Sequence, residues 1–426
     1  MRRRAFVRGA GGATLASLAG AGCLERENDD DPPEEDLDEE DDGTLRVATY
    51  SSMVRGEESA GRWIAEAFQT EFPDAEIVWT VPDAGIDHFV QRARLDADLG
   101  ADVYLGLTAA QLVRVDEALE GRLFESLERD RLERDGRIRD DLEFDDPFER
   151  VVPFDTGYVS VVYDETELDG PESFDDLLDP AFEDGLLVQD PRRSDPGRAF
   201  LLWTVAEYGD GFVDYWRALR DNGAAVSDRW TESYVDGYLE GERPMVVSYS
   251  TDRVGAVAAD RSLERHQVAM LDGRGYESRE GVAVFEGTER PGLAYQFVDF
   301  LLSSDVQVEI AVRNAQFPAV ERDYLELGAE FTTYAREPEE TVRFTYDELR
   351  GNLDDVMAAW VDVWEEELED DDVELDDVVT DEGDDPGANG SDDTETNESA
   401  DPDATDAGDD SGTGGATATD DADDEP

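Results

Sequence analysis

The side chains with the clearest chemistry are aromatic rings and hydroxyls near the ends of short apolar segments. Tyr50 and Ser52 follow the first apolar segment of the chain, and Tyr249 ends a later one. Trp230 and Tyr234 are four residues apart, so on a helix their rings share one face. Such a pair is common in a hydrophobic core, but the polar residues around this one favour a cleft. Aromatic faces attract a cation, by up to about 2 kcal/mol where water is excluded, so the set favours a planar or cationic ligand.

Charged groups of both signs accompany these rings. Asp155 and Asp83 are candidate counter-charges for a cation. Ser194 precedes Asp-Pro and Gly197 at the start of an apolar segment, which is typical of the N-cap of a helix. Amide groups at a helix start can hold an anion, here with one of the two arginines directly before Ser194. A capped helix without a ligand is the alternative.

The sequence excludes several other kinds of function. It contains no Ser-His-Asp order with a nucleophile elbow, no Walker loop and no glycine-rich dinucleotide turn. Cys23 is the only cysteine, and His88 and His266 stand apart, so we expect neither a metal site nor a cofactor. The net charge of −75 excludes ordinary nucleic-acid binding, which needs a basic surface. We therefore expect a binding protein and no enzyme.

The acidic excess extends through the centre of the chain. Residues 44–368 contain 73 acidic and 31 basic residues, a net charge of −42. Self-repulsion destabilises a folded domain with this charge unless salt screens it. The composition therefore predicts a protein from a salt-loving organism. An acidic protein from an ordinary cell is the alternative.

Residues 1–23 have the pattern of an export signal. A pair of arginines precedes Phe6 with twin-arginine spacing, and the mildly apolar segment 9–22 is too short to span a bilayer. Small residues at 20–22 stand directly before Cys23, as in a lipoprotein cleavage box, although Gly occupies the place where Leu is usual. We therefore expect lipid on Cys23 to anchor the protein to the outer face of the cell membrane. An ordinary secretory signal is the alternative.

Strands and helices alternate between two acidic ends. Segments 24–43 and 369–426 lack the large apolar side chains needed for a core, so we expect an acidic disordered tether and an acidic disordered tail. Between them, alternation predicts α/β structure with mostly parallel strands covered by helices. In such sheets, ligands bind beyond the carboxyl ends of the strands. The expected strands are 45–49, 76–80, 101–105, 158–163, 185–188, 245–249 and 281–285, and the expected helices are 59–72, 88–99, 108–119, 197–208, 212–222, 234–240, 291–302, 304–313 and 345–368.

Seven segments, in this order along the chain, resemble the periplasmic thiamine-binding proteins, which are solute receptors of ABC importers. They are VATYSSM (47–53), ADVYLGL (101–107), VVPFDTGYVSVVYD (151–164), QDPRRSDPG with FLLW (189–203), RWTESY (229–234), VVSYST (246–251) and RNAQFPAV (313–320). The resemblance implies a two-lobed periplasmic-binding-protein fold, similar to type II, with the ligand cleft between the lobes. It places lobe 1 at 44–155 and 281–368, and lobe 2 at 156–280.

The resemblance also implies roles for individual residues. It puts Tyr50 at the ligand, the rings of Trp230, Tyr234 and Tyr249 around the thiazolium and pyrimidine rings, and Ser194 and Gly197 near the hydroxyethyl or phosphate end. Three positions depart from the family pattern: Ala315 stands where relatives have a stacking Trp, Gly255 where they have a Tyr, and Ser51 where they have an acidic residue.

The resemblance implies a haloarchaeal-type receptor that acts as a monomer, binds a thiamine-like compound and delivers it to an ABC permease. A receptor for ferric ion or polyamine is the alternative within the same class. A secreted hydrolase is the alternative from another class, and it would require an activated nucleophile that the sequence does not assemble.

Overall fold

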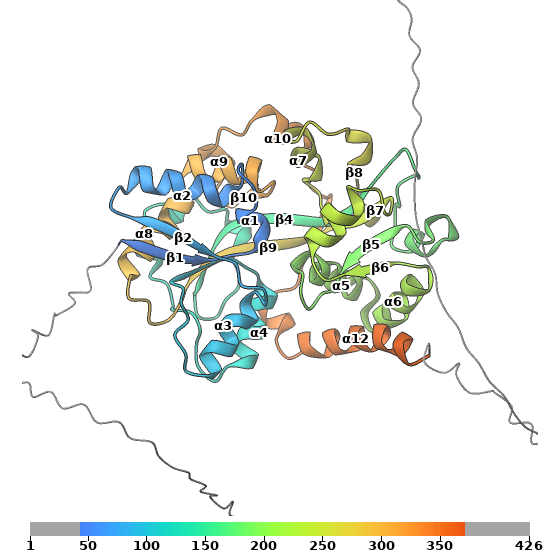
Figure 1. The fold of residues 1–426 in the computed structure, drawn as a ribbon, viewed down its shortest axis with the longest axis horizontal. Coiled ribbons are helices and arrows are strands. Elements are labelled where there is room, and N and C mark those ends of the chain that lie inside the picture. Colours follow the sequence, from blue (N-terminus) through green and yellow to red (C-terminus); the bar gives the residue numbers. More distant parts are fainter. Residues whose placement is uncertain (1–42, 371–426) are drawn as a thin grey trace, which may run out of the picture. The chain divides into compact units, whose positions relative to one another are not determined.

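The structure is a computed structural model that describes residues 43–370 (Figure 1). The expectations for the signal at 1–23, including lipid on Cys23, lie outside the described residues. Those for the tether before Gly43 and the tail after Asp370 also lie outside them.

A single mixed sheet passes through the described part of the chain, with strand order β2-β1-β3-β9-β4-β7-β5-β6. The short strands β8 and β10 pair with β4, and β11 pairs with β9. The strand bounds are β1 Thr44–Ala48, β2 Glu76–Thr80, β3 Val103–Leu107, β4 Val151–Tyr163, β5 Leu186–Gln189, β6 Ala225–Ser227, β7 Met245–Tyr249, β8 Gln267–Ala269, β9 Arg274–Val284, β10 Phe317–Pro318 and β11 Glu340–Val342.

Two long strands at the centre of the sheet connect two sets of parallel strands. The strands β2-β1-β3, which we call the first half, and β7-β5-β6, which we call the second half, pair in parallel within each set. Strands β4 and β9 run antiparallel to each other and to their neighbours β7 and β3. The boundaries expected after Asp155 and Glu280 fall at paired positions of these two strands.

Both central strands are longer than the sequence pattern predicts. Strand β4 begins at Val151 and β9 at Arg274, seven residues before the expected starts of 158 and 281 in both cases. The missed parts contain proline, glycine and charged residues, which disfavour strands. They form strands here because they pair with each other along 151–159 and 276–283, so the sheet satisfies their backbone groups and buries most of their side chains.

Helices cover both faces of the first half. Helices α2, α8 and α9 pack on one face, where Leu45 and Phe68 are buried, and α3 and α4 pack on the other, where Ala48 and Phe89 are buried. The helix bounds are α1 Ser51–Val54, α2 Ala60–Glu71, α3 Ile86–Arg94, α4 Ala109–Ala118, α5 Asp195–Tyr208, α6 Phe212–Asp221, α7 Asp252–Ala258, α8 Pro291–Leu301, α9 Ser304–Arg313, α10 Ala329–Tyr334, α11 Tyr346–Leu349 and α12 Leu353–Asp370, with a π-helix at Thr231–Tyr238.

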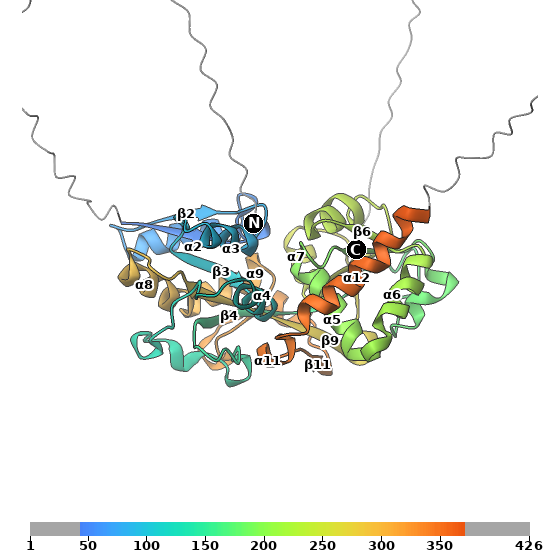
Figure 2. The ribbon, with the colours of Figure 1, turned by 90° about the horizontal axis from the view of Figure 1, so that it is seen from below.

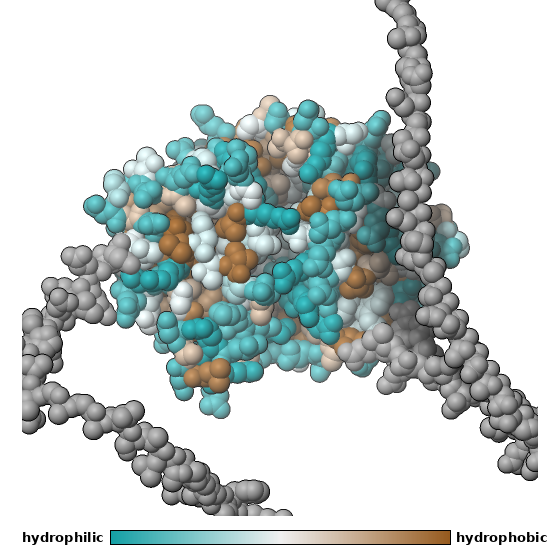
Figure 3. All heavy atoms as spheres, viewed as in Figure 1, coloured by the Kyte–Doolittle hydropathy of each residue, from teal (hydrophilic) through white to brown (hydrophobic). Residues whose placement is uncertain are grey.

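The surface drawn in Figure 3 is mostly hydrophilic, with small and separate hydrophobic patches. This agrees with the acidic composition of the chain. Among residues 43–370, no helix is both long enough and apolar enough to cross a membrane.

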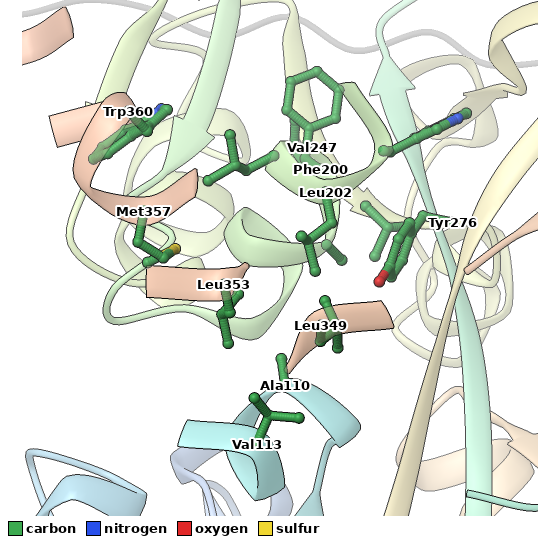
Figure 4. Packing of buried hydrophobic residues seen from close by; sticks show 14 of the residues in the cluster. Ala110, Val113, Phe200, Leu202, Val247, Tyr276, Leu349, Leu353, Met357 and Trp360 are labelled. Atoms are coloured by element: carbon green, nitrogen blue, oxygen red, sulfur yellow. The ribbon is translucent and has the colours of Figure 1, made fainter. Parts of the chain in front are cut away.

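The helix expected at 345–368 is two helices, α11 and α12. The chain turns between them at Gly351, whose φ is +78°, a conformation that favours glycine. Tyr346 of α11 donates a hydrogen bond of 2.7 Å to Asp116 of α4, while Trp360 of α12 packs edge-on against Trp216 of α6. Figures 2 and 4 show α11 and α12 beside α4 and α5, so this segment contacts both halves of the molecule.

Candidate ligand-binding site

A cleft of about 1260 Å³ lies between the first and second halves. The first half contributes the loops after β1 and β2, and the second half contributes the start of α5, the π-helix and the end of β7. The segment after α9, at 312–316, completes the lining. Ligand pockets commonly measure about 300–1000 Å³, so this cleft can enclose a small molecule.

Six of the eight sequence-predicted ligand residues line this cleft: Tyr50, Ser52, Ser194, Trp230, Tyr234 and Tyr249. Asp155 and Gly197 lie outside the lining. Asp155 is fully buried beneath the cleft floor. Gly197 lies against β5, because a Cβ atom there would be 2.4 Å from the carbonyl oxygen of Gln189. Glycine at 197 therefore allows α5 to pack closely on β5.

Trp230 and Tyr234 form one wall of the cleft. Their rings stack with centroids 4.6 Å apart at an angle of 11°, which confirms the prediction that they share a face. The Trp230 Nε1 donates a 3.1 Å hydrogen bond to Ser248, and the Tyr234 hydroxyl donates to Asp252. The other carboxylate oxygen of Asp252 lies 2.6 Å from Nδ1 of the buried His266. These contacts hold the ring pair in one orientation before a ligand arrives.

Two glycines allow the rings of Tyr50 and Tyr249 to lie against the sheet at the cleft floor. A Cβ atom on Gly106 would lie 2.4 Å from the Tyr50 ring, and the φ of +96° at Gly106 also favours glycine. A Cβ atom on Gly157 would lie 2.8 Å from the Tyr249 ring and 2.1 Å from Oε1 of Gln316. Both tyrosine rings can therefore lie in these positions only because the residue beneath each ring has no side chain.

Glu280 is a cleft residue that sequence reasoning missed. It lines the floor next to Tyr50, and it pairs in the sheet with Asp155. Asn314 donates to both the Tyr50 hydroxyl, at 2.8 Å, and Asp155, at 3.2 Å. Burial raises the pKa of Glu280 to about 8. Burial, followed by the charge of Glu280, raises the pKa of Asp155 well above its usual range. Residues 274–280 are mostly polar and do not have the pattern of a strand. The sequence pattern therefore did not place Glu280 next to the cleft.

The start of α5 favours an anionic group, in contrast to the carboxylates at the cleft floor. Ser194 is the N-cap of α5, it is buried, and its Oγ forms no hydrogen bond among the described residues. Arg192 pairs with Asp190 at 2.6 Å, and Arg193 pairs with Asp228 at 2.7 Å. A helix start, a spare hydroxyl and two nearby guanidinium groups together suit an anionic group.

The two halves touch each other at the edges of the cleft. Gln111 of α4 donates to the carboxylate of Asp195 on α5 at 3.0 and 3.2 Å. Arg229 lies 3.6 Å from Asp83, the second candidate counter-charge, which also lines the cleft. Contacts of this kind make the cleft sensitive to a relative movement of the halves.

The three positions that depart from the family pattern all line the cleft: Ser51, Gly255 and Ala315. Their side chains are smaller than those that the pattern expects, so each leaves space in the lining. Within residues 43–370, no group of three or more His, Cys, Asp or Glu side chains is arranged to hold a metal ion.

Two sets of parallel strands that face a cleft, with long strands connecting them, define a protein that binds a small molecule between its halves. Residues 114–328 match the family described as bacterial extracellular solute-binding protein. The chain belongs to this family, and it is a solute-binding protein and not an enzyme.

Similar proteins are consistent with this assignment. The thiamine-binding periplasmic protein of Brucella suis is 28% identical over 325 residues, which cover 75% of this chain and 91% of that protein. The structure of a periplasmic thiamin binding protein matches with a TM-score of 0.65 at 26% identity, over 75% of this chain and 96% of that one. A ferric binding protein from Campylobacter jejuni matches with a TM-score of 0.60 at 14% identity, over 75% and 99% of the two chains, and shows the fold alone. The α/β periplasmic-binding-protein fold is thereby confirmed.

Proposed function

We propose that this protein binds thiamine, a thiamine phosphate or a related planar cation in its cleft and delivers it to the permease of an ABC importer. The main observation that supports this proposal is that stacked aromatic rings line one side of the cleft and a buried carboxylate lines its floor. The names of the most similar relatives support the same ligand class. Residues 44–155 act with the returning segment from 281 as one lobe, 156–280 act as the other, and the lobes close on the ligand. The expected return of the chain to the first lobe through 368 does not hold for α12, which packs against α6 of the second half.

Each part of such a ligand has a suitable counterpart in the cleft. Trp230 offers a ring for stacking, Tyr50 and Tyr249 flank the floor, and Glu280 offers a negative charge for the thiazolium. Ser194 and the arginines beside it suit the hydroxyethyl end or its phosphate ester. The space at Ser51, Gly255 and Ala315 suits a receptor that accepts thiamine with or without phosphate.

Carboxylates and aromatic rings also suit a polyamine, so a polyamine receptor is the second candidate. Thermal unfolding in molar salt with thiamine, thiamine monophosphate, spermidine or ferric citrate separates the candidates. A ligand at a hundred times its Kd stabilises the folded state by about 2.7 kcal/mol. We expect this rise with the two thiamine compounds. A rise with spermidine or ferric citrate, and none with thiamine, would contradict the proposed ligand.

Replacing Ser194 with alanine tests the proposed phosphate end. A hydrogen bond to a charged group contributes about 1.5–3 kcal/mol, so Ser194→Ala should weaken thiamine monophosphate binding by about tenfold or more and leave thiamine binding nearly unchanged. Calorimetric titration of both ligands measures this difference. Ser262→Ala removes an exposed hydroxyl outside the cleft and is the control. An equal loss for both ligands would place Ser194 away from the phosphate.

We also propose that the protein is a haloarchaeal-type lipoprotein that acts as a monomer, is exported by the twin-arginine route and is anchored through Cys23. Small residues directly before the only cysteine support this proposal. Mass spectrometry of membrane fractions should find lipid on Cys23, and Cys23→Ser should release the protein from the membrane. An unmodified Cys23, or a Cys23→Ser protein that is retained equally, would exclude this anchor.

A further inference from the structure

Asp155 and Glu280 form a buried carboxylate pair at the junction of the two halves. Asp155 is 0% exposed and Glu280 is 6% exposed, and they occupy paired positions on β4 and β9. Neither carboxylate forms an ion pair with an arginine among residues 43–370. One oxygen of Asp155 accepts from Asn314, and Glu280 lies next to Tyr50. Oδ1 of Asp155 and Oε2 of Glu280 have no hydrogen-bond partner in that range.

The groups around the pair do not neutralise it. Those that face it from other elements are Tyr50 after β1, Tyr104 on β3, Tyr249 on β7, and Asp195 and Arg198 on α5. The tyrosines are uncharged, because burial raises the pKa of each above its usual range. Arg198 is the one positive charge in this group, and it pairs with Asp195. Two adjacent buried carboxylates without a cation cannot both ionise at neutral pH, so at least one of them is protonated.

The pair is also directed at the ligand space. Glu280 lines the cleft, whereas Asp155 lies directly behind it. An unpaired carboxylate oxygen on a buried side chain is costly unless a partner arrives. A cation in the cleft would supply that partner.

We propose that the Asp155–Glu280 pair is the cation subsite of the cleft, that Glu280 holds a proton while the cleft is empty, and that a bound organic cation replaces this proton. On binding, the carboxylic O–H bond of Glu280 breaks, the proton passes to solvent, and the Glu280 carboxylate remains beside the cation. The number of positive charges at the floor stays constant through this exchange. The inference rests on the proposed function only for the identity of the cation.

The exchange makes binding depend on pH in a definite direction. The pKa of Glu280 in the empty protein is about 8, so Glu280 carries its proton below that pH. A cation that binds below pH 8 must release the proton, and its affinity therefore rises with pH by about tenfold per unit. Above about pH 8 the proton is already absent, and the affinity should become constant.

Calorimetric titration of the full chain with thiamine in molar KCl tests the exchange. At pH 7, buffers with different ionisation enthalpies should report the release of about one proton per thiamine bound. Between pH 6 and 7 the affinity should rise about tenfold. In Glu280→Gln both effects should disappear, while Glu286→Gln, an exposed change outside the cleft, should retain them. The titration of the unchanged protein decides the question even if Glu280→Gln fails to fold.

The outcomes separate this inference from the proposed function. If thiamine binds without proton release and with constant affinity between pH 6 and 8, the cation subsite is wrong and thiamine binding stands. If thiamine does not bind at any pH, the proposed ligand is wrong, and the same titration with spermidine decides the subsite. Absence of proton release with both cations overturns the inference.

Discussion

Transfer from molar salt to about 0.1 M salt is expected to unfold the protein. Residues 44–368 carry a net charge of −42. Exposed arginines of the described chain are already beside carboxylates: Arg193, for example, lies 2.7 Å from Asp228, and Arg322 pairs with Glu337. The remaining acidic side chains repel one another over a Debye length of about 10 Å at 0.1 M salt, compared with about 3 Å at 1 M. Circular dichroism and tryptophan fluorescence during stepwise dilution measure the loss of structure.

Two comparisons identify screening as the cause. Sodium chloride and potassium chloride at equal ionic strength should preserve the fold equally, because screening does not depend on the identity of the cation. Sucrose at the same osmolarity should not replace them if charge repulsion is what unfolds the chain. Retention of the full circular dichroism signal at about 0.1 M salt would show that the acidic surface does not require screening.

Much of the fold follows from local patterns, but the junction of the two halves does not. Helix α9 and strands β2 and β7 have the bounds that the sequence pattern predicts. Helix α9 buries Val306 and Ile310 one turn apart, and β7 is a short apolar run that is almost fully buried. The first parts of β4 and β9 have neither pattern. They are strands because they lie next to each other, although more than a hundred residues separate them in sequence. Pairing over such a distance cannot be deduced from the composition of either segment.

The same distinction divides the candidate site. Trp230 and Tyr234 were predictable because their spacing sets their geometry on a single helix. Glu280 was not predictable because its position depends on the long-range pairing of β9 with β4. Gly106 and Gly157 leave room for the rings of Tyr50 and Tyr249. These contacts also join residues that are far apart in the chain, so they could not be predicted from local sequence.

Trp230→Ala is expected to weaken thiamine binding by about ten- to a hundredfold. Stacking of a flat ring on an aromatic side chain contributes roughly 1–3 kcal/mol, and 1.4 kcal/mol corresponds to about tenfold in Kd. Because Ala315 stands where relatives have a tryptophan, we expect Trp230 to contribute a larger share of the stacking free energy. Trp230 is partly exposed, but its ring stacks on Tyr234 and its Nε1 donates to Ser248, so its loss should reduce the free energy of unfolding of the empty protein by about 1–2 kcal/mol. Calorimetric titration and chemical denaturation in molar salt measure the two effects.

Trp203→Ala is the matched control, since it removes the same side chain from the core. Trp203 is fully buried on α5 and packs edge-on against Phe174, outside the cleft. Its truncation should reduce the free energy of unfolding by about 3–5 kcal/mol and leave the Kd of the folded fraction unchanged. The two variants should therefore show opposite patterns. If Trp230→Ala unfolds the protein, or leaves the thiamine titration unchanged, Trp230 is a packing residue and the ligand lies elsewhere in the cleft.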